Sequence, residues 1–442
     1  MSFLDRLFRT EKEAKVPDVH FGRYTDVYKT AEQYDAWDQA QDLFEEGKYL
    51  ESYRNFLLFL SDPVVENVHY NEEEQELVFE FFQGSKKITG FANQKRVVAE
   101  AKIAQTNQLD AAFMEGLIRR NFDLKYARFA LDDQQRLTIK FDTSTIDGSP
   151  YKLYAALKEL ATNADKQDDL LQDEFSDITL VGVDHLKMIP DAEKHIKYHF
   201  FKQQLEAVAY PITDHGKKVE AYSGGVGYHL LNAAYQLDYL IRPEGFMMET
   251  LERVHRQYFA KDDQTMAEKV VTVRAEFEQL LARPATEYYL EMYQVTSTFG
   301  ITNPTDHDRV RSFIDGELGN MDWYSENGYY DTALAVPGYI VGYCLFNFAI
   351  PLPDRACFHL YYQLMEPAYF SALGFDFNYY DTKKEKFNHK AIRRAIKQIV
   401  KKNRTRFPKL KPALSSLDFT DRVSFAKSYL LMIRNLDMTK IM

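Results

Sequence analysis

The chain has 442 residues, of which 45% are hydrophobic and 27% are charged, and its formal net charge is −11. This balance excludes an intrinsically disordered protein, and the length predicts two to four domains. Only two cysteines are present, Cys344 and Cys357, so the sequence excludes a disulfide-stapled scaffold and favours a reducing compartment.

Two stretches bear on location. No secretory signal opens the sequence, and the short apolar stripe in residues 1–9 predicts a docked or frayed terminal helix, with a helix on a membrane surface as the alternative. Residues 332–353 lack charge over a length that can cross a bilayer, but prolines, glycines and tyrosines interrupt them. We therefore expect a buried helix, no membrane span and a cytoplasmic protein. Gly338 and Gly342, four residues apart, would let a second helix approach closely.

Residues 1–63 predict an N-terminal helical segment. Within residues 36–60 the pattern predicts a helix, a stop at Gly47 and a second helix, which resembles a single tetratricopeptide-type hairpin. No second copy follows at a fixed period, so a solenoid is not expected.

Residues 64–182 alternate between two periods. Hydrophobic alternation predicts strands at 77–82, 88–91, 97–103, 127–131 and 137–141, with a helix at about 112–120. Ser149 is a favoured N-cap and Pro150 suits the first turn of a long helix. The order β-β-β-α-β-β-α predicts an antiparallel sheet with helices on one face, and therefore an α+β fold.

This order, with the helix at about 49–60 before it, resembles the bacterial type III secretion chaperone-like fold, which includes YbjN-type sensory-transduction regulators. The matching stretches are Lys95–Ala104, Asn121–Leu131 and Ser149–Tyr154. The resemblance is confined to residues 49–182. It implies a dimer-forming, partner-binding module without enzymatic chemistry.

Residues 183–380 predict a larger, mainly helical domain. A strand is expected at 178–183, and helices are expected near 191–208, 228–241, 246–260, 264–283 and 287–298. Pro211, Pro243 and Pro284 mark the breaks between them. An aromatic cluster follows at Trp323, Tyr324, Tyr329 and Tyr330.

Two patterns in this domain were weighed as ligand sites. His195 and His199 lie one helical turn apart, a spacing that can chelate a transition metal, with Asp191, Glu193 and His185 nearby. The general-base glutamate of zinc proteases is missing from this motif, and two surface histidines on a polar helix are the favoured explanation. We expect no resident metal or cofactor.

The second pattern is a glycine-rich turn before the helix expected at 228. Backbone N–H groups of Gly224, Gly225 and Gly227, with His229 beside them, would face an anion at a helix start. The turn lacks the lysine of a P-loop and the spacing of a dinucleotide fingerprint. A flexible hinge with a helix start is the favoured interpretation, and the anion site is the alternative.

Acidic residues gather in two further places. Those in 165–174 predict the solvated end of the long helix. Asp306 beside His307 can orient an imidazole, or it can open the next helix through an Asx turn. No nucleophile with a neighbouring base is found, so no catalytic residue is predicted.

Charge is distributed unevenly along the chain. Residues 383–411 carry a net charge of +12 and residues 412–442 carry +1, which leaves −24 on residues 1–382. In the basic segment, which we place at 381–442, Ile392, Ala395 and Ile396 share one helix face. Cations cover the other face and are the predicted partner-binding residues: Arg393, Arg394, Lys397, Lys401 and Lys402. This face could dock on the acidic body of the same chain, on another copy or on another protein.

These observations favour a non-enzymatic, partner-binding protein, a chaperone-like adaptor or regulator of bacterial type that acts through protein contacts, including contacts with itself. An alternative is an enzyme or small-ligand binder with a site in the helical domain, around 224–229 and 323–330. A second alternative is nucleic-acid binding through the basic C-terminal segment.

Overall fold

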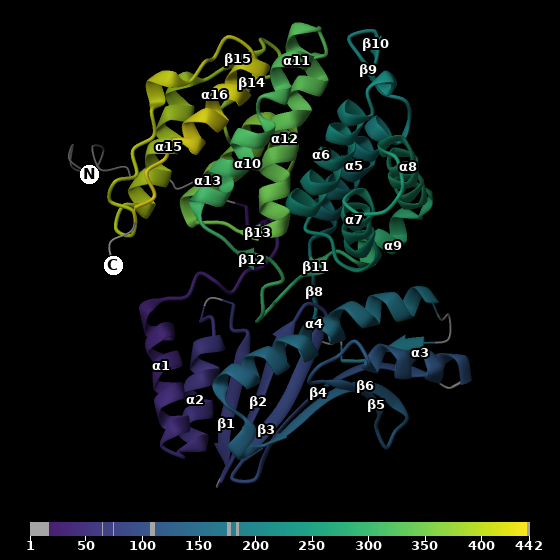
Figure 1. Ribbon diagram of the computed structural model, residues 1–442, viewed down its shortest axis with the longest axis vertical. Helices are drawn as coiled ribbons and strands as arrows, with labels where there is room; N and C mark the ends of the chain where they lie inside the picture. Colours follow the sequence, from purple (N-terminus) through teal and green to yellow (C-terminus); the bar gives the residue numbers. More distant parts are fainter. Residues whose placement is uncertain are drawn as a thin grey trace, which may run out of the picture.

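The structure, a computed structural model, describes residues 17–63, 65–73, 75–106, 111–174, 178–182 and 185–439. The helix predicted in residues 1–9 and the last residue of the strand predicted at 178–183 lie outside these ranges. The described elements gather into two bodies, which we call the sheet module and the helical body (Figure 1).

The sheet module begins with two helices, α1 (Ala31–Glu45) and α2 (Tyr49–Leu60). Gly47, at a φ of +78°, lies in the turn between them and allows the left-handed backbone that ends α1. The predicted helical pair is therefore confirmed. The remaining elements, in chain order, are β1 (Val68–Glu73), β2 (Glu76–Gln83), β3 (Lys86–Asn93), β4 (Arg96–Thr106), α3 (Ala111–Asn121), β5 (Arg128–Leu131), β6 (Arg136–Ser144), α4 (Pro150–Glu174) and β7 (Ile178–Leu180).

The sheet is antiparallel throughout, in the order β1-β2-β3-β4-β6-β5, with β7 paired to β4 near its end. Alternate residues of β2, such as Leu77, Phe79 and Phe81, are buried on one face, because side chains of a strand point to opposite sides in turn. Leu153 and Leu157 of α4 belong to the same core. The predicted α+β class is confirmed. Within this sheet, β1 is the strand that the hydrophobic pattern does not predict, since all its residues but the first are exposed.

The helical body contains twelve described helices. They are α5 (Asp191–Ala209), α6 (Ser223–Ile241), α7 (Gly245–Tyr258), α8 (Met266–Ala282), α9 (Ala285–Leu290), α10 (His307–Glu317), α11 (Asn320–Glu326), α12 (Tyr330–Asn347), α13 (Leu352–Met365), α14 (Pro367–Ala372), α15 (His389–Asn403) and α16 (Arg422–Arg434). Two-residue strands pair as β8 (Lys187–Met188) with β11 (Tyr293–Gln294), β9 (Thr213–Asp214) with β10 (Lys217–Lys218), β12 (Asn303–Pro304) with β13 (Phe348–Ala349), and β14 (Tyr380–Asp381) with β15 (Lys386–Phe387).

Two hydrophobic cores underlie the two bodies. One contains residues from Ala40 to Ala164 together with Phe299, and the other contains residues from Ile189 to Leu436. Helices α1 and α2 therefore pack with the sheet, and α15 and α16 pack with the other helices. Of the four segments expected from the sequence, the first two contribute to one core and the last two contribute mainly to the other.

Helix α12 contains most of the uncharged stretch that has the length of a membrane span. Most of its residues are buried, and its neighbours include α6, α10, α11 and α16. A search of the described helices for a membrane span finds none with the required length and apolarity. The buried helix expected from the sequence is confirmed, and the two glycines face α6: a Cβ on Gly338 would lie 2.2 Å from Oδ1 of Asn232, and one on Gly342 would lie 2.6 Å from Cβ of Tyr235.

Gly342→Ala is therefore expected to destabilise the protein by about 1–3 kcal/mol, because the added methyl group overpacks the contact between α6 and α12. Gly316→Ala in α10 is the matched control, since a Cβ there meets no atom within 4 Å. The control should be neutral or raise stability by up to about 1 kcal/mol through helix propensity. Chemical denaturation measures both, and equal stability of the two variants would contradict a tight contact at Gly342.

Two helix boundaries differ from the expectation by five residues or more. The helix predicted at 287–298 ends at Leu290, because the residues after it return to the sheet module. There the side-chain amide oxygen of Gln83 accepts hydrogen bonds from the backbone of Thr298 and Phe299, at 3.2 and 2.9 Å. The helix predicted to begin near 228 begins at Ser223, so the glycines at 224–227 belong to it. Aromatic rings pack closely against the helix at these glycines.

Candidate functional site

The basic segment forms an exposed cationic surface on α15. Ile392, Ala395 and Ile396 bury one side of the helix in the helical core, and Asn388 caps its start by accepting a hydrogen bond from the backbone N–H of Ala391 at 3.1 Å. The opposite side holds mostly lysine and arginine side chains, together with the exposed His389 and Gln398. We define the basic face as the six exposed cations of this helix: Lys390, Arg393, Arg394, Lys397, Lys401 and Lys402.

The basic face has no acidic counterpart within the described part of the same chain. From residue 383 onward, the salt bridges of the described residues use Lys384, Lys427 and Arg434, none of which belongs to the face. The guanidinium of Arg393 lies 5.5 Å from the ring centre of Phe419 and remains exposed. Among the described residues, the basic face of α15 therefore forms no salt bridge with the acidic body of its own chain.

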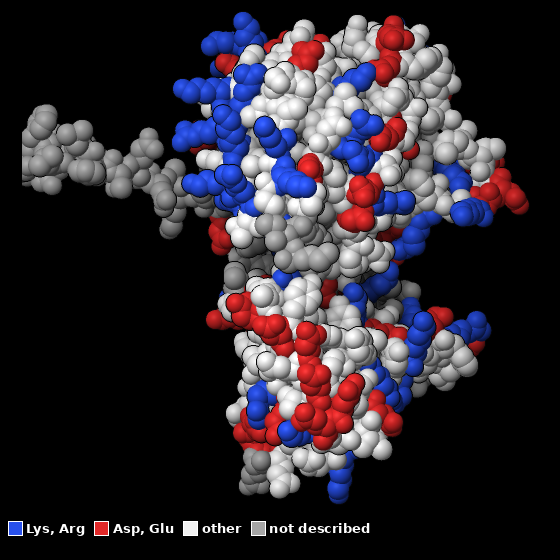
Figure 2. All heavy atoms as spheres, turned by 60° about the vertical axis from the view of Figure 1, so that its left-hand side comes forward, with Lys and Arg blue, Asp and Glu red and all other residues white. Residues whose placement is uncertain are grey.

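A surface of opposite charge lies on α1. Its exposed acidic residues follow a spacing of three or four, which places them on one stripe of the helix, and α1 contains no lysine or arginine. We define the acidic stripe as Glu32, Asp35, Asp38, Asp42 and Glu45. Figure 2 shows basic side chains gathered over the helical body and acidic ones over the sheet module, on the same side of the molecule.

The two histidines weighed as metal ligands are exposed on α5. Nδ1 of His195 shares a 2.8 Å hydrogen bond with the hydroxyl of Tyr289, and nearby Glu193 pairs with Lys197 at 2.9 Å. Among the described residues, His195 and His199 form no cluster with a third metal-ligating side chain. The neighbouring residues therefore give no further support for a metal site at His195 and His199.

The glycines weighed as an anion site lie inside the first turns of α6, and they allow close packing. A Cβ on Gly225 would lie 3.2 Å from Cε1 of Tyr324, and one on Gly227 would lie 2.0 Å from the hydroxyl of Tyr258. Gly224 is less crowded, with the Tyr324 hydroxyl 3.8 Å away. The small residues thus let rings from α7 and α11 lie against α6.

His229, one turn further along α6, has a partner that the sequence does not reveal. Its Nε2 lies 3.1 Å from the hydroxyl of Thr332, which donates its own proton to Asp214 at 2.8 Å. A hydroxyl has a single proton, so His229 is the donor and carries its hydrogen on Nε2. Burial lowers the pKa of His229 to about 4, which makes it neutral near pH 7.

Asp306 and His307 do not act together. Asp306 caps α10 by accepting a hydrogen bond from the backbone N–H of Arg309 at 3.0 Å, the Asx-type role weighed from the sequence. Nδ1 of His307 instead meets the buried carboxylate of Asp354, at 2.9 and 3.1 Å from its two oxygens. This pair joins α10 to α13 inside the helical core.

Charged groups also converge between the two bodies. The guanidinium of Arg23 binds both oxygens of Asp238 and, at 3.0 Å, Oε1 of Glu252. Its Cζ lies 4.0 Å from the ring centre of Phe346. Lys166 of α4 reaches Glu249 and Glu252 of α7. Two cavities, of about 370 and 580 Å³, flank Arg23. The pairs of Lys166 link the sheet module to the helical body, and Arg23 lies beside them on the segment that precedes α1, so we assign both to the joint.

One carboxyl group at the joint stands apart from these pairs. Glu244 is 7% exposed and lines the smaller of the two cavities together with Asp165. Burial raises the pKa of Glu244 well above its usual range, and the nearby charge of Asp165 raises it further. The charges of Arg242 and Arg23 oppose this rise.

Sequence reasoning missed a cluster formed by Asp214, His215 and Asp331. The third residue is more than a hundred positions from the first two, and single acids and histidines give no motif on their own. The aromatic cluster predicted at 323–330 ends at Tyr330, directly before Asp331, and this was the signal in the sequence near the cluster.

In comparisons with known proteins, no family model and no curated protein matches the chain. The resemblance of residues 49–182 to type III secretion chaperones and YbjN-type regulators therefore stays a prediction.

Proposed function

We propose that this protein is a partner-binding protein that receives an acidic protein surface on the basic face of α15, and that its first partner is a second copy of the same chain. The observation that carries this proposal is that two helix surfaces of opposite charge, the basic face and the acidic stripe, lie on one side of the molecule. Among the described residues, neither surface forms salt bridges within the chain. The resemblance of residues 49–182 to a dimer-forming, partner-binding fold supports it.

The placement of the two surfaces suits a symmetric dimer. A twofold axis that crosses this side between the sheet module and the helical body brings the basic face of each copy to the acidic stripe of the other. Such an isologous contact is closed, because the same two patches meet twice. Helices α1 and α15 each have 15 residues, a length of about 22 Å, so the two surfaces also match in extent.

The strength of this contact follows from the exposure of its charges. A single exposed ion pair contributes only about 0.2–1 kcal/mol, so one helix contact is weak. Two equivalent contacts add in the closed dimer, and the charges steer the two copies together at a distance. Salt weakens both effects, because the screening length falls to about 10 Å at 0.1 M ionic strength.

The test is a charge-swap experiment read by sedimentation velocity at low and high salt. One variant reverses the basic face with Arg393→Glu, Arg394→Glu and Lys397→Glu, and the other reverses the acidic stripe with Asp35→Lys, Asp38→Lys and Asp42→Lys. The wild-type protein should dimerise at low salt and dissociate at 0.5 M salt. Each variant alone should be monomeric, and an equimolar mixture of the two should form a heterodimer, because both of its contacts then join opposite charges.

Three results would overturn the proposal. A wild-type protein that stays monomeric at low salt has no self-association of this kind. A dimer that persists in both variants uses another surface. Binding of duplex DNA or RNA by the wild-type monomer, lost in the basic-face variant and falling steeply with salt, would assign the basic face to nucleic acid instead.

A further inference from the structure

A tight hairpin places two potential metal ligands side by side. Strands β9 and β10 pair antiparallel, and the two residues that join them, His215 and Gly216, have φ values of +47° and +80°. Positive φ at both positions matches the twist of a two-residue hairpin. This backbone carries His215 next to the buried carboxylate of Asp214, and the His215 ring packs edge-on against Tyr330, 5.3 Å between ring centres.

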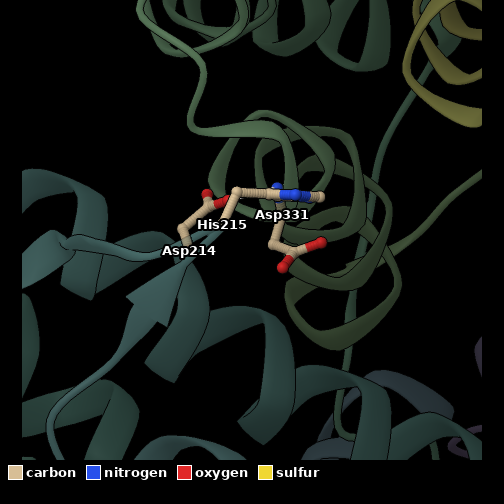
Figure 3. A group of neighbouring side chains, drawn as sticks. All are labelled: Asp214, His215 and Asp331. Atoms are coloured by element: carbon tan, nitrogen blue, oxygen red, sulfur yellow. Dashed lines mark hydrogen bonds between the residues drawn. The ribbon is translucent and has the colours of Figure 1, made fainter.

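The third ligand comes from the helix that Asp214 caps. Oδ1 of Asp214 accepts a hydrogen bond from the backbone N–H of Asp331 at 3.2 Å, and Oδ2 accepts one from that of Thr332 at 2.8 Å. These bonds fix the first turn of α12 against the hairpin. As a result, a carboxylate oxygen of Asp214, a ring nitrogen of His215 and a carboxylate oxygen of Asp331 all lie within 4.8 Å of one another (Figure 3).

The charges of this cluster call for a cation. Neither Asp214 nor Asp331 forms a salt bridge with a lysine or arginine among the residues that the structure describes. Arg422, which opposes the negative charge of Asp331 from a distance, donates instead to the backbone oxygen of Met365 at 2.8 Å. The hairpin and the start of α12 thus hold two carboxylates close together, and a bound cation would offset their repulsion.

The surroundings of Asp214 resemble those that orient metal ligands. Thr332 donates its hydroxyl proton to Oδ2 of Asp214 and accepts one from His229. Hydrogen bonds of this kind fix the direction of a ligating carboxylate. Oδ1 accepts a single hydrogen bond, which leaves it a lone pair for a cation.

We propose that Asp214, His215 and Asp331 bind one divalent transition-metal ion where the β9–β10 hairpin meets the start of α12. One imidazole with two carboxylates suits Mn²⁺, Fe²⁺, Co²⁺ or Zn²⁺ better than Mg²⁺ or Ca²⁺, which prefer oxygen ligands alone. Three protein ligands leave positions open to water or to another ligand. Asp331 also borders a cavity of about 230 Å³ that is lined by His229, Gln236, Glu366 and Arg422, so the proposed site lies next to a polar pocket.

The experiment uses the full-length protein after treatment with EDTA and desalting. Calorimetric titration with MnCl₂, CoCl₂ and ZnCl₂ should show one ion per chain, with MgCl₂ binding more weakly, and Co²⁺ should give a visible absorption band. His215→Gly removes the imidazole while glycine accepts the positive φ of the turn. Asp331→Asn removes a carboxylate from an exposed position. Each variant should weaken binding of the transition metals by at least about tenfold, a loss seen even for outer-shell partners.

A matched control removes the other histidine pair, with His195→Ala and His199→Ala in one chain. This control should bind metal as the wild-type protein does. The proposal is overturned if none of the three transition metals binds the wild-type protein, if both site variants bind as tightly as it does, or if binding is lost in the control. Circular dichroism verifies that each variant keeps the helical content of the wild-type protein.

Discussion

Replacing Arg23 by methionine is expected to lower the free energy of unfolding by about 3–5 kcal/mol, because it leaves the buried carboxylate of Asp238 without its partner. The side chains of Arg23 and Asp238 are 11% and 4% exposed, and the guanidinium binds the carboxylate through Nε and Nη2, at 2.7–3.0 Å. Burial already raises the pKa of Asp238, and Arg23 opposes that rise. Urea denaturation of the variant at pH 7 measures the loss.

Arg256→Met is the matched control, because Arg256 pairs with Glu249 and Glu252 in the same network but is half exposed. Its removal should change stability by no more than about 1 kcal/mol. The double variant Arg23→Met with Asp238→Leu should recover much of the loss, since it removes both buried charges. A loss in Arg23→Met no larger than that of the control would show that the joint does not depend on this ion pair.

The second large effect is expected at His307, where His307→Gln should cost about 3–5 kcal/mol at pH 6 by leaving Asp354 as a buried, unpaired charge. The side chains of His307 and Asp354 are 7% and 0% exposed. Burial lowers the pKa of His307, but the hydrogen bond and charge of Asp354 outweigh it, and the net direction is upward from 6.5. The folded protein therefore holds the imidazole proton more tightly than the unfolded chain does.

The direction of this shift fixes the pH dependence. The stabilisation from protonated His307 is fully present below the unfolded pKa of about 6.5, and it is lost as the pH rises through the higher pKa of the folded state. The stability difference between the wild-type protein and His307→Gln should therefore shrink between pH 6 and pH 8.5. In Asp354→Asn, the NMR titration of His307 should move to lower pH. An unchanged titration would mean that Asp354 does not set the pKa of this histidine.

Much of the fold follows from local patterns in the sequence. Alternation at Leu77, Phe79 and Phe81 predicts a half-buried strand, because successive side chains of a strand point to opposite faces. The 3.6-residue period in 392–400 predicts the buried and basic sides of α15 in the same way. Where the buried pattern is missing, as in β1, the sequence gives no signal although the strand forms.

Some features of the candidate sites follow from local sequence, and others depend on tertiary structure. The basic face could be located from the sequence, because its cations lie on one helix and need no other element to bring them together. Its lack of an acidic partner within the described residues is a fact of tertiary structure. The roles weighed for His195, His199 and the glycines at 224–227 rested on spacing, and spacing does not show that Tyr289, Tyr258 and Tyr324 are their neighbours.

The uneven charge, the α+β order and the buried uncharged helix were determined by the sequence itself, since each depends on residues close together in the chain. Tertiary structure alone decided that His307 pairs with Asp354 rather than Asp306, and that Arg23 joins Asp238. It also decided that Asp331 meets Asp214 and His215. The physical reason is that a local period reports which face of an element is buried, whereas the partner across that face depends on how the whole chain packs.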